Sequence, residues 1–288
     1  MSSQPTGSVS AVEAAPAGSA SKPARIAPPG FWLPAATLWW REIVRFYRQR
    51  SRVVGALGTP LLFWLLIGAG FGSSFRAGGG GPDSVSYLSY LFPGTILLIV
   101  LFTSIFSTIS VIEDRHEGFL LSVLVAPISR SALVMGKVAG GATLALVQGL
   151  IFVLLAPAVG IRLGATQAAE VAAILFLISF AMTALGFYFA WRLDSVQGFH
   201  SVMNLVLMPM WVLSGALFPV SGAHSWIGWI MRVNPLTYGM TALERVMASG
   251  PAPPASLAAS VVVVAGFALV CALASLYEVR RSAARGVL

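Results

Sequence analysis

The 288-residue chain is 57% hydrophobic and only 10% charged, and its mean hydropathy is +0.84. Soluble domains carry about 25% charged residues, so this composition excludes a water-soluble globule as well as a disordered or collagen-like chain. The net charge of +8 comes from residues that flank apolar runs, which is typical of a membrane protein rather than of a nucleic-acid-binding protein. The single cysteine, Cys271, excludes an intrachain disulfide and a cysteine-based zinc site.

The N-terminal 52 residues divide into two parts. Residues 1–30 are rich in Ser, Ala, Pro and Gly and lack the apolar run of about 7–15 residues of a signal peptide, which predicts a disordered cytosolic tail. Residues 32–52 carry one aromatic stripe and one basic stripe at helical spacing, which predicts an amphipathic helix lying at the membrane surface. The stripes are Trp39, Trp40, Ile43 and Tyr47, and Arg41, Arg45, Arg48 and Arg52.

Six apolar stretches follow, and each is long enough to cross about 30 Å of hydrocarbon as a helix. They are residues 53–71, 87–112, 138–159, 171–191, 201–220 and 255–277. The chain from residue 31 to residue 288 is therefore expected to be one all-α polytopic membrane domain. Gly136 and Gly140 stand four residues apart, a spacing that suits close helix packing without identifying the neighbouring helix.

The basic residues predict the orientation of these spans. If the N-terminus is cytosolic, fourteen of the eighteen Lys and Arg residues lie on the cytosolic side. Only Arg76, Arg162, Arg232 and Arg245 lie outside. Because cytosolic loops of membrane proteins are enriched in Lys and Arg, we expect both termini in the cytosol.

The segment after the second predicted span combines charge with a short apolar helix. A charged cluster at 113–117 precedes a helix expected over 119–125, and Pro127 ends that helix because the residue before a proline avoids the helical region. The large side chains expected to face the cytosol are Phe119, Leu120, Val123 and Leu124. Such a face needs a partner, and these residues alone leave open whether that partner is the bilayer or another protein.

The segment after the fifth predicted span stays apolar and aromatic but is interrupted by Pro and Gly. Residues 218–245 are too polar for two full crossings, which favours a re-entrant or interfacial helical hairpin on the outer side. Trp226 and Trp229 would then lie at the depth of the lipid headgroups.

The sequence carries few candidates for chemistry. It has no Gly-x-x-x-x-Gly-Lys-Ser/Thr phosphate loop, and its three histidines do not stand at metal-ligand spacing, so we expect no catalytic residue, metal site or bound cofactor. Charges inside the predicted spans are scarce, which argues against a proton relay. Gln148 and Asn204 are candidate substrate contacts, although interhelical hydrogen bonding would also explain them.

Together, four motifs in this order resemble the permease subunits of type-2 ATP-binding-cassette exporters, in the branch of drug-resistance and nodulation-factor exporters. The first is the Trp/Arg helix, and the second is Phe92-Pro93-Gly94 in the second span. The third runs from Glu113 and Glu117-Gly118-Phe119 to Leu124-Val125-Ala126-Pro127. The fourth combines Ser214-Gly215 and Phe218-Pro219 with Asn234-Pro235-Leu236-Thr237-Tyr238.

The resemblance implies an exporter permease in the bacterial inner membrane that pairs with a second permease, either identical or closely homologous. It implies a separate ATPase subunit that holds ATP and Mg, a surround of membrane lipid, and an amphipathic, drug-like or lipid-like substrate. Residues 119–126 would be the coupling helix. Glu113, Arg115 and Glu117 would link that helix to the amphipathic helix, and the outer hairpin would help to close the exit. A six-span membrane enzyme or assembly factor without transport is the alternative.

Overall fold

The computed structural model describes residues 30–71, 87–126, 128–220, 223–248 and 255–284, so most of the predicted tail and the coupling-loop residue Pro127 lie outside the described residues. Helices are the regular secondary structure throughout these ranges, as the sequence predicts. In chain order they are α1 (Trp32–Arg48), α2 (Arg50–Phe71), α3 (Tyr87–Ser107), α4 (Ile109–His116), α5 (Phe119–Val125), α6 (Arg130–Val153), the 3-10 turn η1 (Ala156–Val159), α7 (Ala165–Arg192), α8 (Val196–Trp211), the π-helical turn η2 (Val212–Ala216), α9 (Ser225–Val233), α10 (Pro235–Met247) and α11 (Leu257–Ala284).

Five stretches among the described residues are long and apolar enough to cross a membrane. They are Tyr87–His116, Arg130–Val153, Ala165–Arg192, Val196–Ala216 and Leu257–Ser282. Each overlaps one predicted span. The remaining predicted span, 53–71, coincides with α2, where the qualifying apolar segment is the shorter Gly58–Gly68.

Two predicted span ends differ from the structure. The span expected over 138–159 begins at Arg130 and ends at Val153, because Pro157 follows in a 3-10 turn that closes at Gly160 with a φ of +81°. The span expected over 201–220 begins at Val196 and loses α-helical geometry after Trp211, where a π-helical turn contains Gly215 with a φ of +100°. Glycine adopts this left-handed region without the steric cost that other residues carry.

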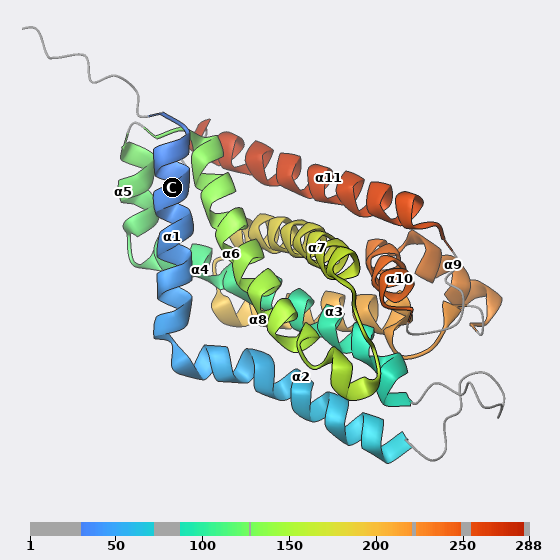
Figure 1. The fold of residues 1–288 in the computed structure, drawn as a ribbon. Helices are drawn as coiled ribbons and strands as arrows, with labels where there is room; N and C mark the ends of the chain where they lie inside the picture. Colours follow the sequence, from blue (N-terminus) through green and yellow to red (C-terminus); the bar gives the residue numbers. More distant parts are fainter. Residues whose placement is uncertain (1–29, 72–86, 127, 221–222, 249–254, 285–288) are drawn as a thin grey trace, which may run out of the picture.

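The long helices run across the view in Figure 1 as a bundle, and different helices lie at its two ends. At one end α1 and α5 lie side by side and cross the bundle. The helix α4 and the C-terminal end of α11 lie at the same end. At the other end lie α9 and α10. The end with α1 and α5 is called the charged end below, because it holds the ion pairs described in the next section.

The bundle is built around α3. Within the apolar windows, 89% of the α3–α4 window is buried but only 22% of the α11 window, so α3 is the core helix and α11 lies at the periphery. Phe92 is fully buried and stacks on Phe152 with 5.2 Å between ring centroids. A Cβ on Gly94 would lie 2.8 Å from the Ala216 carbonyl oxygen, so the glycine allows η2 to approach α3 closely.

Candidate functional site

Helix α1 is docked on α6 at the charged end. Its buried face comprises Pro34, Ala35, Leu38, Glu42 and Phe46. A Cβ on Gly136 would lie 2.7 Å from the Ala35 carbonyl oxygen, and one on Gly140 would lie 2.7 Å from Glu42 Cβ. The two glycines, whose spacing suggested close packing, therefore create the groove that accepts α1.

Three buried charges meet beneath α1. Lys137 of α6 is 4% exposed, and its Nζ donates to Glu42 Oε1 at 2.7 Å, to Ser110 Oγ at 3.3 Å and to Asp114 Oδ2. Glu42 is 5% exposed and Asp114 is fully buried. Buried charges are tolerated when they are paired and hydrogen-bonded, and this cluster meets both conditions.

Two arginines of α1 complete the cluster from its solvent side. Arg41 binds Asp114 with both guanidinium nitrogens, at 2.9 and 2.7 Å, and its hydrogen bonds to Asp114 raise its pKa above the usual value. Arg45 donates to the same carboxylate at 2.6 Å. Arg41 also lies 3.7 Å from the centre of the Phe119 ring, a cation–π contact that joins α1 to α5. Asp114 is thus held by α1 and α6 together.

Two of the three predicted linking residues contact α1. Arg45 Nη2 lies 2.9 Å from Glu113 Oε2 and 3.3 Å from Glu117 Oε1. Arg115 does not join this cluster, because it points to the opposite side of α4. There it donates to Asp194 Oδ1 and to the Trp191 carbonyl oxygen, both at 2.5 Å, and so ties α4 to the α7–α8 connection.

The sequence reasoning missed the centre of this site. The stripe pattern of residues 32–52 does not single out Glu42, and the pattern at 113–117 indicates only a charged cluster that contains Asp114. Lys137 stands directly before the span predicted at 138–159 and is one of the fourteen basic residues predicted on the cytosolic side. Its position on an apolar helical face was the available signal, since lysines are rarely fully buried unless paired.

The short helix α5 spans the predicted residues, but its buried face differs from the prediction. Gly118 precedes it with a φ of +75°, which turns the chain sharply after α4. Leu120 and Val123 are buried at 1% and 9% exposure, and Phe119 and Leu124 are half-buried. The expectation that Leu120 and Val123 face the cytosol is therefore wrong, because that face packs onto the bundle.

The apolar surface that α5 does expose lies on its other face. Leu121 is 47% exposed and Val125 is 87% exposed. These two residues are called the α5 outer face below. They are four residues apart, so they stand one above the other on the helix.

The predicted interfacial aromatics divide between two environments. Trp39 is half-buried, and its Nε1 donates to Thr143 Oγ1 of α6 at 3.0 Å, so it packs on protein rather than facing lipid. Trp40 and Tyr47 are 59% and 47% exposed. They lie seven residues apart and so share a face that remains available to the bilayer surface.

Helices α9 and α10 form within the segment where a hairpin is expected. Asn234 caps α10 by accepting from Leu236 N at 3.0 Å, and its Nδ2 donates to the Met210 carbonyl oxygen at 2.6 Å. Pro235 begins α10, and Tyr238 donates its hydroxyl to the Arg232 carbonyl oxygen at 2.9 Å. Phe218 and Pro219 are half-buried in the connection before α9. The motif residues thus tie the hairpin to α8.

The two candidate substrate contacts differ in burial. Gln148 is 2% exposed, and its Oε1 accepts from the Thr103 hydroxyl inside the bundle, while its Nε2 has no partner among the described residues. Asn204 lies on an exposed face of α8. The structure therefore does not bring them to one site.

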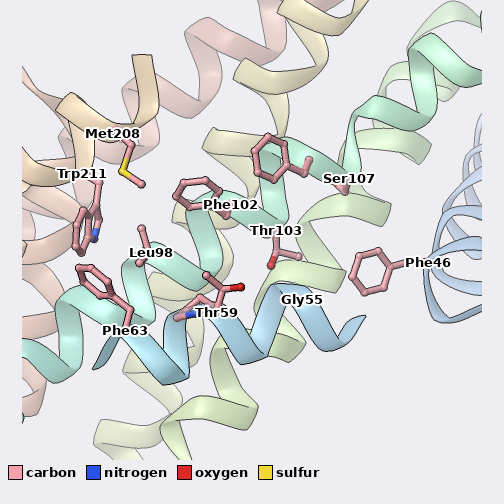
Figure 2. Close-up of a pocket in the computed structure, with 12 residues that line it drawn as sticks. Phe46, Gly55, Thr59, Phe63, Leu98, Phe102, Thr103, Ser107, Met208 and Trp211 are labelled. Atoms are coloured by element: carbon pink, nitrogen blue, oxygen red, sulfur yellow. The ribbon is translucent and has the colours of Figure 1, made fainter. Parts of the chain in front are cut away.

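A largely apolar pocket of about 420 Å³ lies between α1, α2, α3 and α8 (Figure 2). Its walls include Phe63 and Trp211, whose rings meet edge to face at 5.8 Å. Its polar side chains are the hydroxyls of Thr59, Thr103 and Ser107. Thr103 is also the partner of Gln148, so Gln148 stands behind the pocket wall.

Comparisons with known proteins match this architecture to one family. The family model for the ABC-2 type transporter matches residues 35–248. Nodulation protein J of Rhizobium meliloti is 26% identical over 222 residues, which cover 74% of this chain and 79% of that protein.

Two further relatives are named as transport permeases. The daunorubicin resistance ABC transporter permease protein DrrB1 of Streptomyces coeruleorubidus is 23% identical over 215 residues, or 72% of each chain. The inner membrane transport permease YadH of Escherichia coli is 23% identical over 216 residues, which cover 72% of this chain and 80% of that protein. Because the family match extends from α1 to the end of α10, this chain belongs to the ABC-2 type transporter family and is a membrane-embedded transport permease.

Proposed function

We propose that this permease is the transmembrane subunit of an ATP-driven exporter in the bacterial inner membrane. A separate subunit binds ATP and Mg and hydrolyses the nucleotide. The substrate is amphipathic, drug-like or lipid-like and leaves the cell. A relative named as a daunorubicin resistance ABC transporter permease supports a drug-like substrate.

The observation that carries the proposal is the α5 outer face on a helix whose opposite face is buried in the bundle. Leu121 and Val125 are exposed, while Leu120 and Val123 anchor the same helix to the bundle. The Arg41 contact with Phe119 connects α5 to the buried ion cluster. A push on α5 by a partner would therefore reach α1, α4 and α6 together. Glu113 and Glu117 of the charged cluster pair with Arg45, so this cluster supports a link between α4 and α1.

The proposed topology has six spans, with α2 as the first and both termini in the cytosol. The charged end is then cytosolic, and α9 and α10 form a re-entrant hairpin on the outer side. Exposed Trp226 and Trp229 on α9 support a position at headgroup depth. The described N-terminal and C-terminal ends of the chain both lie near the charged end (Figure 1), which supports a common side.

Cysteine labelling in a Cys271→Ala background tests this topology. We expect Ser122→Cys and Ser195→Cys to react only when a membrane-impermeant maleimide reaches the cytosol. Thr166→Cys and Ser225→Cys should react from outside in intact cells, since all four positions are exposed in the structure. Labelling of Ser122→Cys in intact cells would contradict the orientation.

A second permease, identical or closely homologous, is proposed to cover the exposed sides of α2 and α8. On α8, Leu205 is 76% exposed and Met208 is 45% exposed, and on α2, Leu66 is 72% exposed. Met208 also lines the apolar pocket. Pairing on this side would place the two pockets at a common interface, where a substrate could pass between the subunits.

The apolar pocket is proposed to hold the apolar part of the substrate. Thr59→Trp should fill it, because Thr59 is exposed and lines the pocket. We expect ATP-dependent substrate uptake by inside-out vesicles to fall at least tenfold, while permease abundance and ATPase co-purification stay near parental levels. The matched control is Thr166→Trp, which makes the same change at an exposed position of α7 that does not line the pocket. Unchanged transport by Thr59→Trp would remove the pocket from the substrate path.

A further inference from the structure

A second apolar groove lies on the opposite flank of the bundle, between α6 and α11 with α7 as its floor. Its volume is about 420 Å³. The α11 wall includes Leu269, Leu273 and Leu276, and the α6 wall includes Val134 and Met135. Figure 1 shows α7 lying between these two helices. The volume lies within the range of about 300–1,000 Å³ that is common for ligand sites.

The flank around this groove is apolar on its outward side. On α11, Val262 and Val270 are 70% and 64% exposed, and Leu269 and Leu273 are 60% and 55% exposed. In a membrane-embedded protein, outward apolar side chains of this kind face lipid tails. A groove that opens into the hydrocarbon is filled by an acyl chain, since an empty groove would forfeit the dispersion contacts of its walls.

Two arginines extend the groove walls at its charged end. Arg280 follows Leu276 by four residues and Leu273 by seven, so it continues the same stripe of α11. Arg130 precedes Val134 by four residues and so continues the stripe of α6. Both arginines are exposed, and neither has a hydrogen bond or ion pair with another described residue.

Nearby groups leave these two positive charges uncompensated. Glu278, the acidic residue on α11 beside Arg280, lies 3.8 Å from Arg192 at the end of α7. Ser131 lines the groove next to Arg130 and adds a hydroxyl at the same end. An apolar groove that ends in two free arginines has the chemistry of a lipid site with an anionic headgroup.

We propose that this groove binds one anionic phospholipid, with an acyl chain between α6 and α11 and the phosphate between Arg130 and Arg280. The lipid bridges the ends of two helices that contact each other far less than each contacts α7. It lies in the cytosolic leaflet, a placement that rests on the orientation proposed above. The binding itself depends on neither ATP nor transport.

Native mass spectrometry of the full-length permease, titrated with palmitoyl-oleoyl-phosphatidylglycerol after delipidation, tests the proposal. We expect one tightly retained lipid per permease and weaker retention of the phosphatidylcholine of the same chains. Arg130→Gln/Arg280→Gln should weaken phosphatidylglycerol binding about tenfold or more, since each basic residue near the surface contributes about 1 kcal/mol. Ala272→Phe, which fills the groove and keeps both arginines, should produce a similar loss.

The matched control is Arg162→Gln/Arg232→Gln, which removes the same charge at the opposite end. It should bind phosphatidylglycerol like the parent. Parental binding by either groove variant would overturn the proposal, and an equal loss in the control would reveal only general attraction to anionic lipid. The experiment measures lipid binding and not transport. A negative binding result therefore leaves the proposed exporter function intact, and a failed transport assay leaves the lipid-binding result intact.

Discussion

Lys137→Met is expected to detach α1 from α6 and to reduce the abundance of the permease in membranes severely. The substitution removes the ammonium that lies 2.7 Å from Glu42 and leaves that carboxylate only the more distant Arg41 guanidinium, at 3.7 Å. It also removes one partner of fully buried Asp114. Removing one member of a buried ion pair costs about 3–5 kcal/mol, because a buried charge stays uncompensated. The measurements are membrane abundance and the thermal unfolding midpoint of the purified protein.

The double variant Glu42→Gln/Lys137→Met separates charge from packing. It also removes the charge of the Glu42 carboxylate, while Asp114 keeps Arg41 and Arg45. We expect the free energy of unfolding of the double variant to exceed that of Lys137→Met by about 1–3 kcal/mol, because residues in one ion-pair network are energetically coupled. Arg48→Met on the exposed face of α1 should be nearly neutral. If Lys137→Met unfolds at the parental temperature, the cluster does not hold α1 in place.

Leu121→Asp/Val125→Asp is expected to release the ATPase subunit and to abolish transport while the permease still folds. Both side chains are exposed on the α5 outer face, so the charges enter water in the isolated permease. In a complex they would enter a desolvated contact, where anchor residues contribute about 2 kcal/mol or more each. The measurements are pull-down of the ATPase subunit and permease abundance in the same membranes.

Two single substitutions on α5 sharpen this experiment. Leu120→Asp places a charge at a position that is 1% exposed, so it should reduce permease abundance itself instead of releasing a partner from a folded permease. Val125→Ile keeps the apolar surface and should retain the ATPase. Parental retention of the ATPase by Leu121→Asp/Val125→Asp would show that α5 does not couple the subunits.

The contrast between Leu120 and Leu121 shows where local pattern stops being informative. The residues predicted to form α5 do form it, because Gly118 allows the turn and an apolar run follows. The run contains a single polar residue, Ser122, however, so its period does not reveal clearly which side packs on the bundle. The same ambiguity affects the spans, where lipid-facing and protein-facing side chains are both apolar. Hydropathy therefore predicted the existence of the helices better than their contacts.

The sequence by itself determined the helical class of this protein, its membrane character, its family and the position of α5. It also predicted an amphipathic helix over 32–52, although α1 ends at Arg48, and a hairpin within 218–245, although the ends of α9 and α10 came from the structure. These features follow from composition, local period and short motifs, which act within a few residues of chain. Only the tertiary structure decided that Gly136 and Gly140 receive α1, and that Glu42, Asp114 and Lys137 form one buried cluster. Those three charges are separated by up to 95 residues, and their pairing depends on how α1, α4 and α6 pack together.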